Sequence, residues 1–157
     1  MELLDHESLT FIVRWVHVVS MAVILGGVGL VWSMAPKSRS ETPITFAVFL
    51  RAAEKYEWLF WGAFGLIVMT GVGNLGAFGN AVPDPYSSWG RIFSIKISIV
   101  FAFILVSVVR GLVAAGLSAS DAGALNPRGC RLLSGLYGVT LLLVAAILLA
   151  AEELSHG

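Results

Sequence analysis

Residues 15–36, WVHVVSMAVILGGVGLVWSMAP, contain no Asp, Glu, Lys or Arg over 22 positions. A helix needs about 20 mostly apolar residues to cross the hydrocarbon core of a bilayer. Two further stretches without charge follow, at residues 58–83 and 132–151. A fourth apolar stretch, residues 92–109, is interrupted by Lys96 alone. The pattern therefore predicts a membrane protein with four spans.

The composition of the whole chain points the same way. Of its 157 residues, 57% are hydrophobic and 13% are charged, whereas soluble globular proteins carry roughly 25% charged residues. This composition argues against a nucleic-acid partner, and the net charge of zero shows no basic or acidic bias. Long apolar runs without alternation favour helices over barrel strands. We therefore predict an all-α, polytopic four-helix bundle in which residues 1–157 form one transmembrane domain, with spans near 10–35, 57–79, 91–110 and 131–151.

The basic residues predict how the bundle is oriented. Seven of ten lie in or beside the first and third connections. They are Lys37, Arg39, Arg51, Lys55, Arg110, Arg128 and Arg131. The positive-inside rule places these connections in the cytoplasm, so both termini face outward from the inner (plasma) membrane. The tryptophans agree, because Trp15 and Trp89 would border the outer face and Trp32, Trp58 and Trp61 the inner one.

The first connection also carries a helix-start signal. Thr42-Pro43 is typical of an N-cap followed by proline at the first helical position, and apolar residues then recur at helical spacing. We expect span two to begin here as one long helix; a separate helix lying in the membrane interface is the alternative. Residues 116–130 are small and polar, and we interpret Asn126-Pro127-Arg128-Gly129 as a stop signal within a loop.

His17 is the strongest chemical candidate because an ionisable side chain inside a membrane segment is a functional candidate by default. Met21 follows at i+4 and shares its helix face. Imidazole and thioether together suit Cu(I), since soft sulfur ligands favour that ion. Met69 of the second span could contribute from a comparable depth. The alternatives are a neutral histidine bonded across helices and methionines used only for packing.

Three cations lie near the same outer boundary. Spans one and three run in the same direction, so Lys96 is predicted at a depth similar to His17. Arg14 and Arg91 cluster at the boundary itself. Together they could bind an anionic ligand such as the propionates of a haem; the alternative is that Lys96 extends its ammonium to the outer surface.

Glycines punctuate spans one, two and four. Small residues let helix backbones approach each other where lipid provides no hydrophobic drive. They predict either tight packing within the bundle or a groove for a flat cofactor or a partner subunit. Expected partners are therefore the lipid bilayer and either a second copy or other membrane subunits.

Several kinds of catalytic machinery are missing from the sequence. It has no phosphate-binding loop, no hydrolase nucleophile motif, no zinc motif and no paired intramembrane carboxylates, which argues against ATP-driven transport and hydrolysis. With one intramembrane histidine, a bis-histidine haem within one chain is not expected. Whether the chain is an enzyme stays open; if it is one, we expect a haem-dependent membrane oxidoreductase.

Two segments resemble the CopD copper-resistance membrane family. The first, RWVHVVSMAVILGG (residues 14–27), is similar to that family's opening helix, with an early histidine and a later Gly-Gly. The second joins MTGVGN (residues 69–74) to YSSWGRIFSIK (residues 86–96). It resembles a Thr-Gly near one helix end, a Tyr-Gly-Arg-like turn and a helix containing a lysine. The resemblance implies a polytopic inner-membrane protein linked to copper uptake or tolerance. Copper handling or transport across that membrane would use His17, Met21 and Met69, the metal ligands that the residues themselves suggest.

The Trp-x-His of span one and the lysine of span three also resemble the small, haem-binding HemJ-type protoporphyrinogen oxidases. That likeness implies haem b with His17 as axial ligand and Lys96 as a functional partner, beside Arg14 and Arg91. The chain is much shorter than many CopD proteins and lacks a Met-rich or His-rich tract. Copper handling is the leading hypothesis, haem binding the second and a cofactor-free accessory subunit the third.

Overall fold

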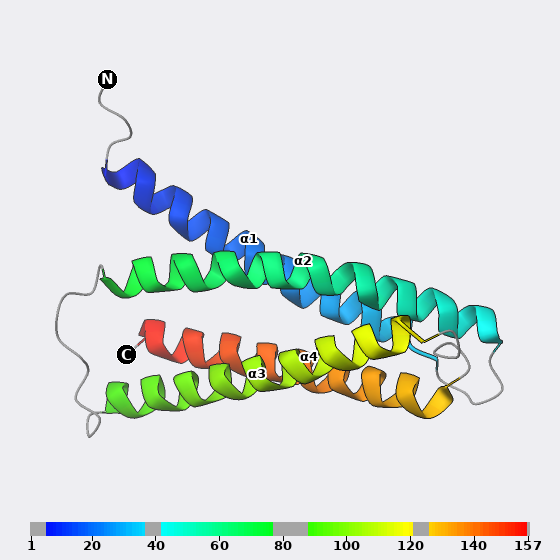
Figure 1. Cartoon of the computed structure of the whole chain (residues 1–157). Helices are drawn as coiled ribbons and strands as arrows, with labels where there is room; N and C mark the ends of the chain where they lie inside the picture. Colours follow the sequence, from blue (N-terminus) through cyan, green and yellow to red (C-terminus); the bar gives the residue numbers. More distant parts are fainter. Residues whose placement is uncertain (1–5, 37–41, 77–87, 121–125, 157) are drawn as a thin grey trace.

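The computed structural model describes residues 6–36, 42–76, 88–120 and 126–156 (Figure 1). They form four helices, and the described residues contain no strand: α1 (His6–Ser33), α2 (Pro43–Gly76), α3 (Ser88–Ser118) and α4 (Pro127–His156). The predicted all-α four-helix bundle is confirmed.

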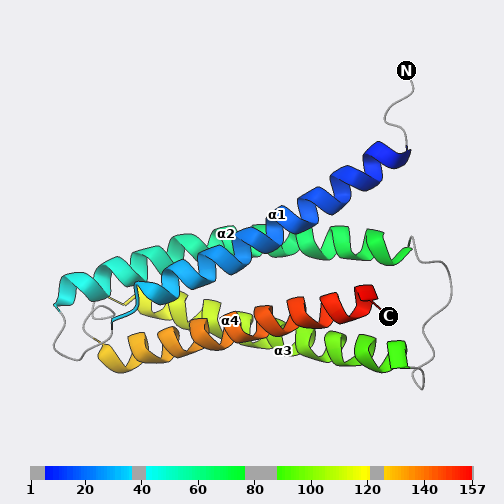
Figure 2. The same cartoon turned by 180° about the vertical axis from the view of Figure 1, so that it is seen from behind.

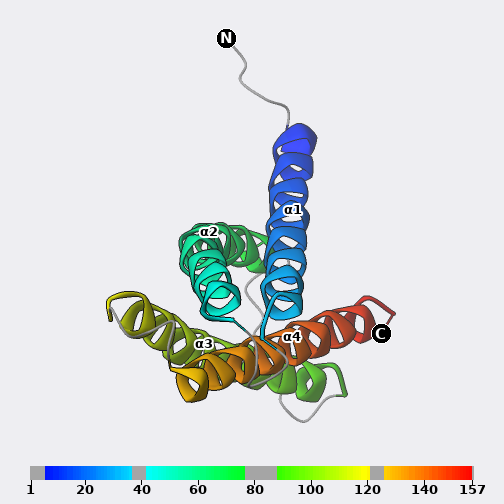
Figure 3. The ribbon, with the colours of Figure 1, turned by 90° about the vertical axis from the view of Figure 1, so that its right-hand side faces the viewer.

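Successive helices run in opposite directions, so the start of α1 and the end of α4 lie at the same end of the bundle (Figures 1 and 2). We call the half nearer these ends the terminal half and the other the distal half. α1 packs chiefly on α2 and α3 on α4, while contacts of α1 with α4 and of α2 with α3 join the two pairs (Figure 3).

Three helices are long and apolar enough to cross a bilayer: α1 over Ser8–Ser33, α3 over Gly90–Ser118 and α4 over Pro127–Glu152. The chain is therefore an integral membrane protein. The described part of α2 differs because Glu54, Lys55 and Glu57 precede its apolar stretch. Its crossing of the membrane stays a prediction.

The long second helix is confirmed. α2 begins at Pro43, and the Thr42 carbonyl accepts hydrogen bonds from the backbone N–H groups of Thr45 and Phe46. From there α2 is continuous to Gly76, so the alternative of a separate interfacial helix is wrong. The first turns are amphipathic: Phe46 and Phe49 are buried and charged side chains such as Arg51 are exposed.

Two expectations about the third connection are wrong. α3 continues to Ser118, so Arg110 lies two turns inside the helix and not in the connection. Asn126 starts α4 and does not mark a stop: its Oδ1 accepts from Gly129 N (3.0 Å) and its carbonyl accepts from Cys130 N (3.1 Å). Asparagine at the N-cap with proline next fits a helix start equally well. Lys37 and Arg39 lie outside the described residues.

The hydrophobic core occupies the distal half and the middle of the bundle. Its buried members span residues 24–31 of α1 with Ala35 just beyond that helix, 46–63 of α2, 103–114 of α3 and 130–144 of α4. Among the side chains that the structure describes, none in α1 before Ser20 is buried. This part of α1 tilts away from the other helices (Figures 1 and 3), so the terminal half is the more open part.

The α1–α2 contact depends on a close approach at Gly27. The Tyr56 ring lies directly against it, and a Cβ added there would overlap this ring. The Tyr56 hydroxyl donates to the Ile24 carbonyl at 2.8 Å, which prevents the ring from moving aside without losing a buried hydrogen bond. Glycine thus lets a tyrosine of α2 reach the backbone of α1.

We expect Gly27→Ala to destabilise the protein by about 1–3 kcal/mol, because overpacking displaces the Tyr56 ring. The matched control is Gly26→Ala, since a Cβ at Gly26 meets nothing within 4 Å. This control is expected to be neutral or stabilising by up to about 1 kcal/mol, as alanine is the better helix former. Thermal unfolding in detergent measures both. Equal unfolding temperatures for the two variants would contradict the proposed contact.

Candidate functional site

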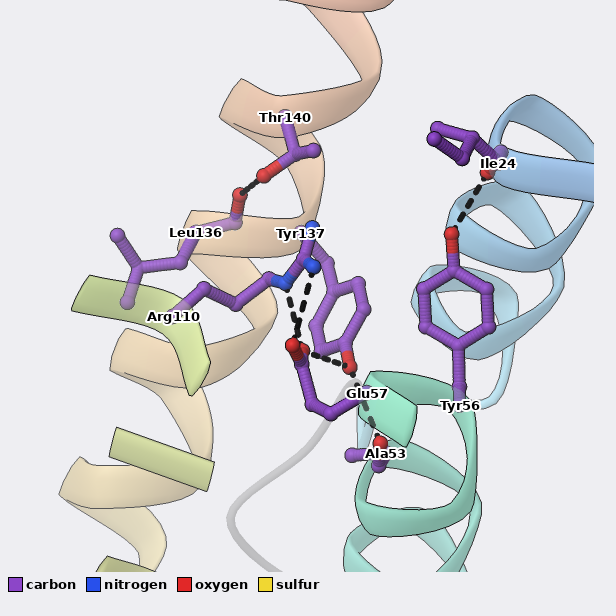
Figure 4. Close-up of polar contacts among 8 residues, drawn as sticks. All are labelled: Ile24, Ala53, Tyr56, Glu57, Arg110, Leu136, Tyr137 and Thr140. Carbon is purple, nitrogen blue, oxygen red and sulfur yellow. Dashed lines mark hydrogen bonds and ion pairs between the residues drawn. The ribbon is translucent and has the colours of Figure 1, made fainter. Parts of the chain in front are cut away.

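A buried ion pair joins α2 to α3. Arg110 Nε donates to Glu57 Oε1 at 2.7 Å, and Arg110 Nη2 donates to Glu57 Oε2 at 3.1 Å. The Tyr137 hydroxyl of α4 donates to Oε1 at 2.9 Å (Figure 4). We call Glu57, Arg110 and Tyr137 the ion-pair network. It provides two parallel hydrogen bonds between guanidinium and carboxylate, the strongest geometry for such a pair.

Aromatic rings surround the guanidinium. Its Cζ lies 4.2 Å from the centroid of Phe60, 4.9 Å from that of Tyr137 and 5.9 Å from that of Tyr56. Arg110 is 0% exposed, and a desolvated cation over an aromatic face gains about 2 kcal/mol or more. Arg110 Nη1 and Ser107 Oγ have no hydrogen-bond partner among the described residues.

The ion-pair network was not predicted from the sequence. Arg110 was counted with the third connection, and Glu57 was not considered. A signal was available: each charge borders a long apolar run, one at the start of span two and one at the end of span three. Because those spans are antiparallel, the two charges lie at the same depth. An intramembrane charge is stable there only with a partner.

Removing one member of the pair should strand the other in an apolar interior. We expect Glu57→Met or Arg110→Met alone to cost about 3–5 kcal/mol, and the double variant to cost less than the sum of the two. The control is Glu54→Met, which changes an exposed carboxylate one turn earlier on α2. Unfolding free energies from titration of detergent micelles with dodecyl sulfate measure the cycle. Strictly additive losses would contradict a direct interaction.

A second polar cluster lies in the terminal half. His17 Nδ1 of α1 is 2.8 Å from the Thr70 hydroxyl of α2. That hydroxyl donates its only proton to carbonyls of its own helix, Leu66 O at 2.7 Å and Ile67 O at 3.2 Å. One arrangement of protons satisfies all three contacts: the hydroxyl donates to its own helix and accepts from His17 Nδ1–H. In this tautomer the lone pair of the imidazole is on Nε2.

Lys96 of α3 lies within electrostatic range of the His17 ring, although the described residues of α1 and α3 do not pack on each other. Both side chains are half-buried. The His17 ring also rests on α2 at Gly71, where an added Cβ would lie 3.8 Å from Cε1. We call His17, Thr70 and Lys96 the His17 cluster; it combines a fixed imidazole with a nearby cation.

The structure does not bring every predicted site residue to His17. Met21 is partly buried and packs against the core, one helical turn from His17. Met69 is 74% exposed and so faces away from the interior. Arg14 and Arg91 are exposed. Thr70, which holds the histidine, was missed because the Thr-Gly pair was valued only for its resemblance to a family motif.

Among the described residues, no group of three or more His, Cys, Asp or Glu side chains could hold a metal ion. Cys130 is buried and not in a disulfide. A metal bound at the His17 cluster would therefore need His17 together with a sulfur ligand, and a cofactor would need His17 together with the neighbouring positive charges. No protein-family model, curated protein or solved structure matches this chain.

Proposed function

We propose that this integral membrane protein binds a b-type haem in its terminal half, with His17 as the axial ligand. The 2.8 Å hydrogen bond between His17 Nδ1 and Thr70 Oγ1 carries the proposal, in which the imidazole is the donor. Metal-ligating histidines almost always donate their second ring nitrogen to a fixed acceptor, which sets the tautomer and the ring orientation. Thr70 performs this role for His17 and leaves Nε2 for iron.

The charges near His17 favour haem over a bare metal ion. Lys96 repels a free cation but attracts the propionate groups of a haem. Arg14 and Arg91, predicted at the same membrane boundary, add positive charge for these groups. The apolar, exposed surface of the start of α1 suits the porphyrin edge. A bound haem would supply one-electron redox chemistry.

Copper is the second candidate, and Met21 is the observation in its favour. Met21 shares a helix face with His17 and is partly buried, so imidazole and thioether lie on one side of α1. This pair suits Cu(I). The resemblance to CopD proteins supports the same function. A copper site would need a further ligand, and the exposed Met69 does not provide it in this arrangement.

We expect purified protein in detergent to show a haem Soret band that sharpens on reduction, as isolated or after titration with haemin. His17→Ala should weaken haem binding by about 100-fold or more, and Thr70→Val by about 10–100-fold through loss of the acceptor that orients the ring. Lys96→Gln should weaken it several-fold. Absorbance titration and metal analysis of the same samples provide the measurement.

The control is His156→Ala, which removes a histidine far along the chain. Haem binding that survives His17→Ala would rule out His17 as the ligand. A colourless protein with stoichiometric copper that is lost in His17→Ala and Met21→Leu would favour the second candidate instead. No colour and no metal after loading would reject both and leave the accessory-subunit hypothesis.

We also propose that the terminal half faces the outside of the inner membrane. Six of the ten basic residues belong in sequence to the distal side of the bundle, and three belong to the terminal side. The six are Lys37, Arg39, Arg51, Lys55, Arg128 and Arg131. Arg110 is left out of this count because it is buried in the ion-pair network. The remaining basic residues still favour a cytoplasmic distal side.

Reporter fusions test this orientation. A C-terminal alkaline phosphatase should be active in a bacterial host, and a C-terminal green fluorescent protein should be dark, because each works on one side of the membrane only. Fusions after Ser120, at the end of α3, are the matched control and should give the reverse pattern. A fluorescent C-terminal fusion would show that the termini are cytoplasmic.

A further inference from the structure

A groove on the distal side runs between α2 and α3. It encloses about 420 Å³ and is open to one side, and a volume of this size is typical of small-molecule sites. α2 contributes acidic and aromatic side chains, and α3 contributes small ones. The lining residues are Glu54, Glu57, Trp58, Trp61, Gly111, Ala114, Ala115, Ser118 and Ala119.

Gly111 opens the floor of the groove to two polar atoms of α2. A Cβ added at Gly111 would lie 3.4 Å from Glu57 Oε2 and 3.5 Å from Trp61 Nε1. The two carboxylate oxygens of Glu57 differ in their surroundings. Oε1 accepts from Arg110 Nε and from Tyr137, whereas Oε2 accepts from Arg110 Nη2 at the longer distance of 3.1 Å. The oxygen at the groove is thus the less saturated one, with lone pairs left for a ligand.

The lining of the groove is acidic. It includes two carboxylates, those of Glu54 and Glu57, and no basic side chain. Arg110 behind Glu57 balances the charge of that carboxylate, so Glu54 provides the net negative charge of the groove. Trp58 and Trp61 offer aromatic faces within the same lining, and aromatic faces attract cations. Carboxylates and indole rings attract a positive charge, and the apolar floor beside them can contact an apolar group. The groove therefore suits a ligand that has both.

We propose that the α2–α3 groove binds a lipophilic organic cation, an ammonium or phosphonium with an apolar body. The positive centre lies between Glu54 and the Oε2 edge of Glu57, against the indoles. The apolar body covers the floor formed by Gly111, Ala115 and Ala119. This site is independent of the haem proposal, since it shares no residue with the His17 cluster.

A packed helix is the competing occupant, because Gly111, Ala115 and Ala119 repeat every four residues and such stripes also join helices. A lipophilic cation is the better occupant because two carboxylates, those of Glu54 and Glu57, would be unfavourable in an apolar contact between helices. The two occupants also respond differently to substitution, which the experiment below exploits.

Tetraphenylphosphonium is the probe, and tetraphenylborate is its control of like size and shape but opposite charge. Equilibrium dialysis of the full chain in detergent measures binding, and quenching of tryptophan fluorescence provides a second readout. We expect saturable binding of the cation only. Glu54→Gln should lower its affinity about two- to fivefold, which is the strength of an exposed charge pair. Ala115→Leu, which fills the groove, should lower it by at least about tenfold.

Two matched variants lie outside the groove. Glu152→Gln removes an exposed acid at the other end of the bundle, and Ala145→Leu enlarges an exposed alanine of α4; both should bind the probe normally. Absence of saturable binding would overturn the proposal, as would equal binding of tetraphenylborate or affinity unchanged by Ala115→Leu. If Ala115→Leu instead converts an oligomer to a monomer without changing probe affinity, the groove is a helix-packing face.

Discussion

A charged pair held inside the bundle is the interaction on which this arrangement of helices depends. Glu57 and Arg110 are both buried, and each would be costly to leave without its partner in a medium of low polarity. The two hydrogen bonds between them constrain the relative position of α2 and α3. Tyr137 adds α4 to the same carboxylate. Tyr56, the neighbour of Glu57 on α2, reaches the backbone of α1. One turn of α2 therefore sets the position of all four helices.

Because these contacts are concentrated in the distal half, the two halves of the molecule differ in how closely their helices are packed. The distal half contains the network, its aromatic rings and most of the buried core, so its helices are closely held. In the terminal half α1 diverges, and the side chains around His17 are half-buried or exposed. A ligand can be inserted there without breaking a packed core. The contact between His17 and Thr70 is still defined, because their hydrogen bond itself joins α1 to α2 in this half.

The helical architecture was predictable because long uncharged runs admit few structures in a bilayer. The start of α2 followed from a local signal, Thr42-Pro43. Asn126-Pro127 carried equally local information but was misread, since the same residues end one helix and begin the next. His17 and Lys96 could be singled out as intramembrane ionisable residues, and their similar depth followed from parallel spans. The contact of His17 with Thr70 and the Glu57–Arg110 pair depend on helix rotation, which a pattern of hydrophobicity along the chain does not determine.

The position of Glu57 links stability to binding. Its carboxylate belongs to the ion pair on one side and lines the α2–α3 groove on the other. The oxygen at the groove, Oε2, accepts the longer of the two hydrogen bonds from Arg110. A substitution of Glu57 would therefore disturb the packing of α2 on α3 and the lining of the groove together. Glu54 and Ala115 line the same groove outside the ion pair, so changes at these two positions separate binding from stability.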